Sequence, residues 1–84
     1  MSAEQQQSKY KPCSPELLAT LATNIKRLRK EQGLSQEKLA ERAGLHRTFI
    51  SLIERSGRNA TLGVIEAIAN ALEVSVYALL KPSP

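Results

Sequence analysis

Apolar residues recur at helical spacing along most of the chain. The longest stripe predicts an amphipathic helix over residues 15–32, whose buried face consists of Leu18, Leu21, Ile25 and Leu28. Shorter stripes of the same period predict four more helices, over residues 36–43, about 46–55, 62–72 and 76–80. No segment shows the alternation of a half-buried strand, and no segment repeats another. The pattern therefore predicts an all-α fold of five short helices.

Residues that begin and end helices flank these stripes. Four of the predicted helices follow a hydroxyl residue whose oxygen can accept a hydrogen bond from a free amide of the first turn, namely Ser14, Ser35, Thr61 and Ser75. Gly33 and Gly44 end the first two helices, because glycine accepts the left-handed backbone of a tight helix end. Residues 56–60 combine glycine with turn-favouring residues and are predicted to form a loop.

The turn that contains Gly44 is too short for the helices on either side of it to lie side by side. The first of these helices has its apolar stripe at residues 39, 40 and 43, and the second has Phe49, Ile50 and Ile53. Two short helices joined in this way form a helix-turn-helix, whose second helix can enter the major groove of DNA. The stretch from residue 35 to residue 58 is therefore the candidate DNA-binding element.

The charge of the chain is concentrated in this same stretch. Residues 26–58 contain nine Lys and Arg against four Glu, a balance of +5. Residues 1–25 balance to 0 and residues 59–84 to −1. A charge run alone is usually a solvated face, but its coincidence with the helix-turn-helix favours a surface that meets a polyanion.

The composition limits the chemistry that the chain can perform. With 84 residues, of which 42% are hydrophobic, we expect one domain over residues 14–84 after a disordered polar tail over residues 1–13. The chain has one cysteine, one histidine and no aspartate, so it lacks the residues for an internal disulfide, a zinc cluster or a catalytic set. We therefore expect neither enzyme activity nor a cofactor or metal.

The sequence also lacks the features of a membrane or exported protein. No apolar run approaches the ~20 residues that a membrane span requires, and the polar N-terminus has no signal-peptide core. We expect a cytoplasmic protein with no membrane partner. Because the length leaves no room for a second, ligand-sensing domain, we also expect no small-molecule effector.

Several residues of the central stretch stand in the order and spacing of a known family. Gln36, the pair Leu39-Ala40, Gly44, Ile50 and Glu54 resemble the phage repressor and Cro-like helix-turn-helix family, also called XRE-type. The run HRTFISLIERSGRNATL, residues 46–62, is most similar to the controller proteins of restriction–modification systems. The likeness covers roughly residues 25–80. It implies a compact, five-helix, lambda-repressor-like domain that binds double-stranded DNA.

The exposed arc of the predicted helix 46–55 contains the candidate base-reading residues. If its apolar residues point inward, the outer arc carries Arg47, Thr48 and Ser51. Arg47 can donate two hydrogen bonds to guanine, and Thr48 can bond a base edge or pack its methyl group on thymine. The resemblance implies the same two positions as base readers. The alternative for Arg47 is a surface ion pair with Glu37 or Glu41.

Residues on both sides of this arc are candidate contacts to the phosphate backbone. The resemblance implies that Gln36 bonds a phosphate beside the free amides of its helix N-terminus, where an anion is stabilised. On the other side we predict backbone contacts from Arg55, Arg58 and Asn59, and His46 and Phe49 are further candidates for backbone contacts. The alternatives are that His46 caps its helix and that Phe49 is a core residue.

Glu54 falls between two residues expected to be buried, which is an unfavourable position for an unpaired carboxylate. The resemblance implies a partly buried salt bridge between Glu54 and Arg29 of the first helix. We assign this pair a structural role, in which it holds the first helix against the recognition helix.

The last predicted helix and the residues before it carry more apolar surface than a small monomer exposes. This predicted dimer interface consists of Val74, Val76, Tyr77 and Leu80. The alternative is that some of these side chains complete the core. With a homodimer, the sequence predicts a sequence-specific transcriptional regulator that binds a palindromic operator. Rival interpretations are a protein–protein interaction module or an antitoxin with the same fold, and a non-specific nucleic-acid binder.

Overall fold

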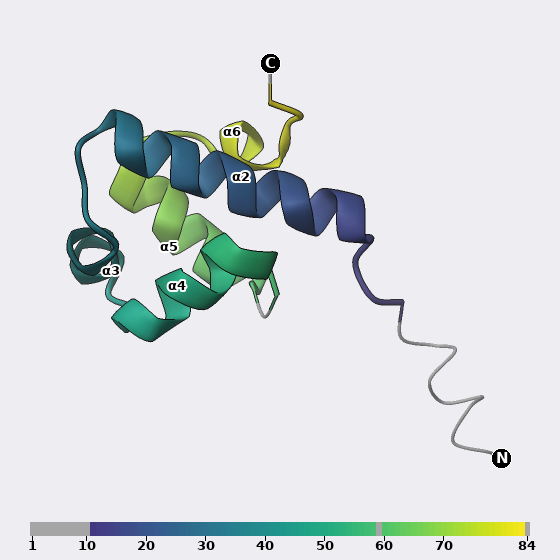
Figure 1. Ribbon diagram of the computed structural model, residues 1–84, viewed down its shortest axis with the longest axis horizontal. Coiled ribbons are helices and arrows are strands. Elements are labelled where there is room, and N and C mark those ends of the chain that lie inside the picture. The colour runs from purple at the N-terminus through teal and green to yellow at the C-terminus, as the bar shows by residue number, and fades with distance from the viewer. Residues whose placement is uncertain (1–10, 59, 84) are drawn as a thin grey trace, which may run out of the picture.

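The computed structural model describes residues 11–58 and 60–83, and this part of the chain contains five α-helices and no strand (Figure 1). In chain order the helices are α2 (Pro15–Glu31), α3 (Gln36–Ala43), α4 (Arg47–Ser56), α5 (Leu62–Leu72) and α6 (Val76–Leu80). The predicted all-α fold is confirmed. The first ten residues of the predicted tail lie outside the described residues, and residues 11–13 form no helix or strand.

The predicted helix starts are confirmed by the capping hydrogen bonds. The hydroxyl groups of Ser14, Ser35, Thr61 and Ser75 each accept a hydrogen bond from the amide three residues later. The bounds of α4 differ from the prediction by one residue at each end. His46 is the N-cap rather than the first helical residue, and Ser56 belongs to the last turn because the left-handed Gly57 ends the helix after it.

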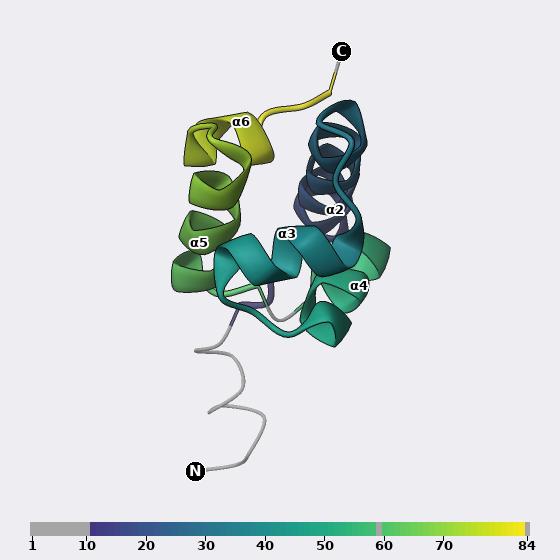
Figure 2. The ribbon, with the colours of Figure 1, turned by 90° about the vertical axis from the view of Figure 1, so that its left-hand side faces the viewer.

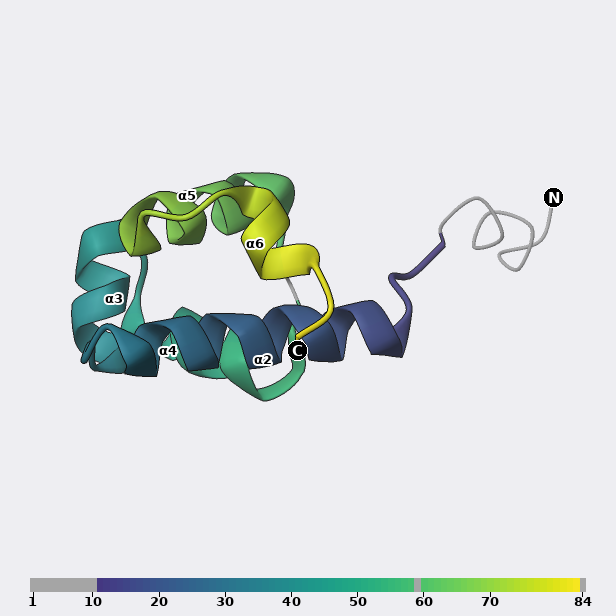
Figure 3. The same ribbon diagram turned by 90° about the horizontal axis from the view of Figure 1, so that it is seen from above.

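The five helices enclose one apolar core. α2 and α4 lie on one side of the molecule, α5 lies on the other, and α3 closes one end between them (Figures 2 and 3). The short helix α6 packs against both α5 and α2. Side chains from all five helices are fully buried between them, including Ile25, Leu39, Ile53, Leu72 and Leu79. The predicted apolar stripes therefore face inward, with Leu28 half-buried against the core. Leu18, predicted on the buried face, is only half-buried and lines a hollow beside the end of α4.

Gly57 fixes how closely α2 and α4 approach each other. Its φ of 71° is in the left-handed region, and a Cβ atom there would lie 2.4 Å from the carbonyl oxygen of Leu18. Gly44 has nearly the same φ, 70°, but an added Cβ would meet nothing within 4 Å. Glycine is favoured at both positions by the backbone conformation, and at position 57 it is also required by the packing of α4 against α2.

Candidate nucleic-acid interface

The turn between α3 and α4 presents the outer face of α4 to solvent. Ile50 and Ile53 have no exposed surface, so the opposite face of the helix points outward. On that face Arg47 and Thr48 are exposed and Ser51 is half-buried. The three predicted base-reading residues therefore lie on one accessible side of the recognition helix.

A small hollow brings these three residues together with the start of α3. It has a volume of about 160 Å³ and is lined by Gln36, Arg47, Thr48 and Ser51. Gln36 lies in the first turn of α3, where amide groups without helical partners make the surroundings favourable for an anion. The predicted phosphate ligand and the predicted base readers thus form one continuous polar surface.

Arg47 does not form the alternative ion pair with Glu37 or Glu41. Among the described residues, the carboxylate of Glu41 pairs with Lys38 at 3.5 Å, and no ion pair of Arg47 is found. Arg47 is exposed, so its guanidinium group is accessible to a ligand. An accessible guanidinium group can donate two hydrogen bonds to a guanine.

His46 and Phe49 take part in local structure. The imidazole Nδ1 of His46 accepts a hydrogen bond of 3.3 Å from the amide of Thr48, so His46 caps α4. Phe49 is half-buried and packs against the core. The two alternatives drawn from the sequence, a cap and a core residue, describe these contacts. Phosphate binding by either residue stays a prediction.

A charged cluster behind this surface joins α2, α3 and α4. The Nε and Nη2 groups of Arg29 donate to the two carboxylate oxygens of Glu54, at 2.6 and 3.0 Å. Its Nη1 group donates to the carbonyl oxygen of Leu34 at 2.7 Å. The side chains of Arg29 and Glu54 are only 10% and 3% exposed. The carboxylate is thus paired in bidentate geometry, which is the strong form of this interaction.

Gln36 belongs to the same cluster, and this contact was not expected from the sequence. Its Nε2 group donates to the carboxylate Oε1 of Glu54 at 3.1 Å. The carboxylate therefore fixes the side chain of Gln36, which also lines the hollow beside Arg47. An amide 18 positions from its partner gives no sequence signal, because both helices must already be packed for the two groups to meet.

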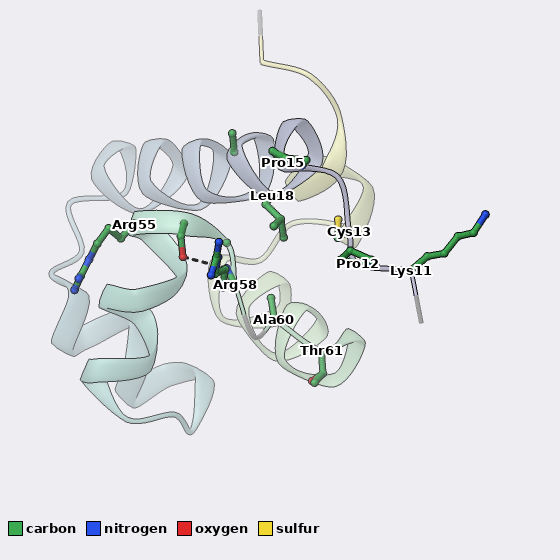
Figure 4. Close-up of a pocket in the computed structure, with 12 residues that line it drawn as sticks. Lys11, Pro12, Cys13, Pro15, Leu18, Arg55, Arg58, Ala60 and Thr61 are labelled. Carbon is green, nitrogen blue, oxygen red and sulfur yellow. Dashed lines mark hydrogen bonds between the residues drawn. The ribbon is translucent and has the colours of Figure 1, made fainter. Parts of the chain in front are cut away.

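Two predicted basic contacts lie at the end of the recognition helix, Arg55 in the last turn of α4 and Arg58 just after it. Arg55 and Arg58 are exposed, and both line a hollow of about 970 Å³ between the start of α2, the end of α4 and the start of α5. Figure 4 shows that Arg55 and Lys11 point away from each other at opposite ends of this hollow. The third predicted contact of this loop, Asn59, lies outside the described residues.

The four residues of the predicted dimer interface differ in exposure. Tyr77 is 71% exposed and projects from α6. The other three, Val74, Val76 and Leu80, are half-buried and pack against the core, so they both complete the core and retain some accessible surface. The alternative drawn from the sequence therefore applies in part to each of the three aliphatic residues.

Within residues 11–58 and 60–83, no group of three His, Cys or carboxylate residues is placed to hold a metal ion. In the same part of the chain no helix has the length and apolar character needed to cross a bilayer.

A recognition helix exposed by a tight turn, on a base fixed by a buried ion pair, defines a helix-turn-helix DNA-binding domain. The sequence profile of the helix-turn-helix family matches residues 25–79, and the chain belongs to this family, in its XRE type. DNA binding and the regulation of transcription are properties of this family.

Known proteins with similar sequences agree with this assignment. The control protein C.SmaI of Serratia marcescens is 46% identical over 68 residues, which cover 81% of this chain and 81% of that protein. The immunity repressor of Bacillus phage phi105 is 43% identical over 61 residues, which cover 73% of this chain and 42% of that protein. These relatives are regulatory proteins and not enzymes.

Solved structures show the same fold. The hypothetical transcription factor NHTF from Neisseria has a TM-score of 0.77 and 45% identity, over 84% of this chain and 82% of that one. The wild-type restriction–modification controller protein C.Esp1396I has a TM-score of 0.71 and 44% identity, over 75% of this chain and 82% of that one. The predicted likeness to the repressor and controller family is confirmed.

Proposed function

We propose that this protein is a sequence-specific transcriptional regulator that binds a palindromic operator in double-stranded DNA as a homodimer. The observation that carries the proposal is the polar surface on which Gln36, Arg47, Thr48 and Ser51 meet. It is exposed, has no carboxylate among its lining residues, and lies in the segment of the chain with a net charge of +5. Similarity to a control protein and to a phage immunity repressor supports it.

In this proposal the start of α4 reads the bases. Arg47 donates two hydrogen bonds to O6 and N7 of a guanine, and Thr48 contacts a neighbouring base edge or a thymine methyl group. Ser51, one turn farther along the helix, adds a third contact. All three approach through the major groove, because only that groove admits a helix and distinguishes all four base pairs.

Phosphate contacts on both sides hold the helix in register. Gln36 and the free backbone amides of the first turn of α3 bind one phosphate. The side-chain amide of Gln36 is already oriented by its hydrogen bond to Glu54. Arg55, Arg58 and Asn59 bind the backbone beyond the other end of α4, and His46 and Phe49 add contacts near its start. Such contacts fix orientation without adding sequence information.

One short recognition helix contacts too few base pairs to define a unique site. A two-fold dimer doubles the site and places two half-sites about 34–36 Å apart, one turn of the double helix. We assign the dimer interface to the apolar surface of Val74, Val76, Tyr77 and Leu80. A protein with this function acts on DNA in the bacterial cytoplasm.

Selection of randomised DNA duplexes at near-physiological salt tests the proposal. We expect the wild-type protein to recover one palindromic motif. Arg47→Ala should lose discrimination at one position of each half-site, by about 1–3 kcal/mol for a bidentate contact. Lys26→Ala removes the same charge from an exposed position on α2 and is the control, which should recover the wild-type motif.

Two outcomes would contradict the proposal. Binding that only fades as salt rises, with no motif recovered, would indicate a non-specific nucleic-acid binder. No DNA binding at all would indicate a protein–protein interaction module or an antitoxin that acts only with its partner.

A further inference from the structure

Two polar residues of α2 are buried as whole residues. One is Arg29, in the charged cluster behind the recognition helix, and the other is Asn24, which has no exposed surface. Asn24 lies outside the nucleic-acid interface. A buried amide is costly unless its hydrogen-bonding groups have partners, so the partners of Asn24 show what it holds in place.

All these partners but one belong to the C-terminal segment. The Nδ2 group of Asn24 donates to the carbonyl oxygens of Leu79 at 2.9 Å and Lys81 at 2.7 Å. Its Oδ1 atom accepts hydrogen bonds from the hydroxyl group of Ser83 and from Nη2 of Arg27. One side chain in the middle of α2 thus joins this helix to the end of α6 and the residues that follow.

α6 depends on such contacts because it has only five residues. A helix of this length is unstable alone, and the last carbonyl groups of any helix lack partners within it. Leu79 anchors α6 in the core through its buried side chain, and Asn24 binds the carbonyl group of the same residue. Position and orientation of α6 are therefore set from α2.

A second amide side chain, that of the C-cap residue of α2, makes a similar contact to α5. The Nε2 group of Gln32 donates to the carbonyl oxygen of Leu72 at 2.7 Å, at the last residue of that helix. The two contacts share the same donor chemistry, but Gln32 is exposed and donates once, whereas Asn24 is buried and donates twice. Gln32 is therefore a control for the loss of an amide contact to α5, and the half-site measurement below separates the role of Asn24 from its burial.

We propose that Asn24 is a positioning residue for the dimer interface, which it controls by fixing the end of α6. The inference rests on the proposed homodimer and on the assignment of its interface to α6. Asn24 is too deeply buried to touch a partner. It acts through α6, whose exposed Tyr77 and half-buried Leu80 are presented in one orientation only while the end of the helix is held.

Sedimentation equilibrium of Asn24→Ala and Gln32→Ala tests this inference. We expect the dimer dissociation constant to rise at least tenfold in Asn24→Ala and less than twofold in Gln32→Ala. Binding of the monomer to a duplex with a single half-site should be unchanged in both, because neither contact reaches α3 or α4. A merely structural role would weaken dimerisation and half-site binding together.

Equal dimer dissociation constants in the two variants would overturn the inference while leaving the proposed function intact. A wild-type protein that remains monomeric on its operator would instead overturn the proposed homodimer. If Asn24→Ala fails to fold, Ser83→Ala decides, since it removes one partner of the amide at an exposed position. Amide hydrogen exchange in Ser83→Ala should be faster than in the wild-type protein in α6 and unchanged in α4. Exchange in α6 at the wild-type rate would overturn the inference.

Discussion

Buried side chains of α2 connect this helix to two other parts of the molecule. We call these two sets of contacts ties, and they differ in charge. Near the end of α2, Arg29 holds the recognition helix through a bidentate ion pair with Glu54. Near its middle, Asn24 holds α6 through neutral amide hydrogen bonds. Removal of one partner leaves an uncompensated buried charge in the first case, but an unpaired amide or carbonyl group in the second, which costs less. The contact that holds α4 on α2 is therefore stronger than the contact that holds α6.

The surfaces that these ties support are also unlike. α4 presents polar and cationic side chains within a segment of net charge +5, whereas residues 59–84 have a net charge of −1. The residue most exposed on α6 is the aromatic Tyr77. The first surface suits a polyanion and the second suits a second protein subunit. In the proposed dimer, the recognition helix is then held more firmly than α6, so the strength of dimerisation can vary while the recognition helix keeps its position.

The largest effect is expected from breaking the charged tie. Glu54→Ala should lower the free energy of unfolding by about 3–5 kcal/mol, because Arg29 then remains buried without a counterion. Urea unfolding measures this loss. Glu31→Ala is the control, since it removes the exposed Arg27–Glu31 pair of 3.3 Å and should cost less than about 1 kcal/mol. Similar losses in the two variants would show that the buried pair has no special role.

The next effect concerns how α4 is seated on α2. Gly57→Ala should cost about 2–4 kcal/mol, because it combines a left-handed residue with a Cβ atom 2.4 Å from the carbonyl oxygen of Leu18. Gly44→Ala has the same backbone conformation but open space around the new atom, and should cost about 1 kcal/mol. Thermal unfolding compares the two. A difference near zero would mean that α2 and α4 move apart freely.

Most of the fold was predictable because its signals are local. The capping residues Ser35 and Thr61 start their helices as predicted, and the turn at Gly44 joins α3 to α4. The predicted end of α4 was one residue too early, because Ser56 is a residue type that favours turns. In the structure Ser56 is the last helical residue, and the left-handed Gly57 ends the helix after it. Periodicity, caps and turns depend on neighbours in sequence, so the sequence alone defines them.

The contacts between distant residues were predictable only in part. The pairing of Arg29 with Glu54 was inferred from resemblance, whereas the donation from Gln36 to Glu54 was not foreseen. Asn24 gave no signal at all, because an asparagine in an amphipathic helix is as easily a surface residue as a buried one. Its role depends on where α6 returns to α2, and that is decided by the packing of the whole core.

The dimer dissociation constant tests the proposed role of the apolar surface of α6. Tyr77→Ser should raise the dimer dissociation constant at least tenfold, because an exposed aromatic residue at the centre of an interface contributes about 2 kcal/mol or more. The stability of the monomer should change by less than about 0.5 kcal/mol, as for other exposed positions. Sedimentation and urea unfolding measure the two quantities. A wild-type dimer constant in Tyr77→Ser would move the interface away from α6.

Removing one cation next to α4 and one next to α6 tests which of the two surfaces meets DNA. Arg58→Gln should weaken operator binding similarly for all sequences and lower the slope of log affinity against log salt by about one, because one phosphate contact is lost. Lys81→Gln removes the single cation of residues 59–84 and should leave the slope unchanged. Titrations at several salt concentrations measure both slopes. A slope lowered by the same amount in Lys81→Gln would show that α6 also faces DNA, and an unchanged slope in Arg58→Gln would show that Arg58 makes no phosphate contact.

The smallest effect concerns the way the helices end. Glycine in the left-handed region follows α2, α3 and α4, whereas α5 ends on Glu73 with a φ of 57°. A non-glycine residue in this conformation destabilises the folded state by about 1–2 kcal/mol. Glycine removes this strain, but part of the gain is lost because glycine gives the unfolded chain more conformational entropy.

Glu73→Gly should therefore stabilise the protein by up to about 1 kcal/mol in urea unfolding. Glu66→Gly, at an exposed position inside α5, is the control and should destabilise it by about 1 kcal/mol. Dimerisation should be retained in Glu73→Gly, because the backbone before α6 keeps its conformation. A loss of stability there would mean that Glu73 contributes more than its backbone, and that the junction between α5 and α6 is already optimised.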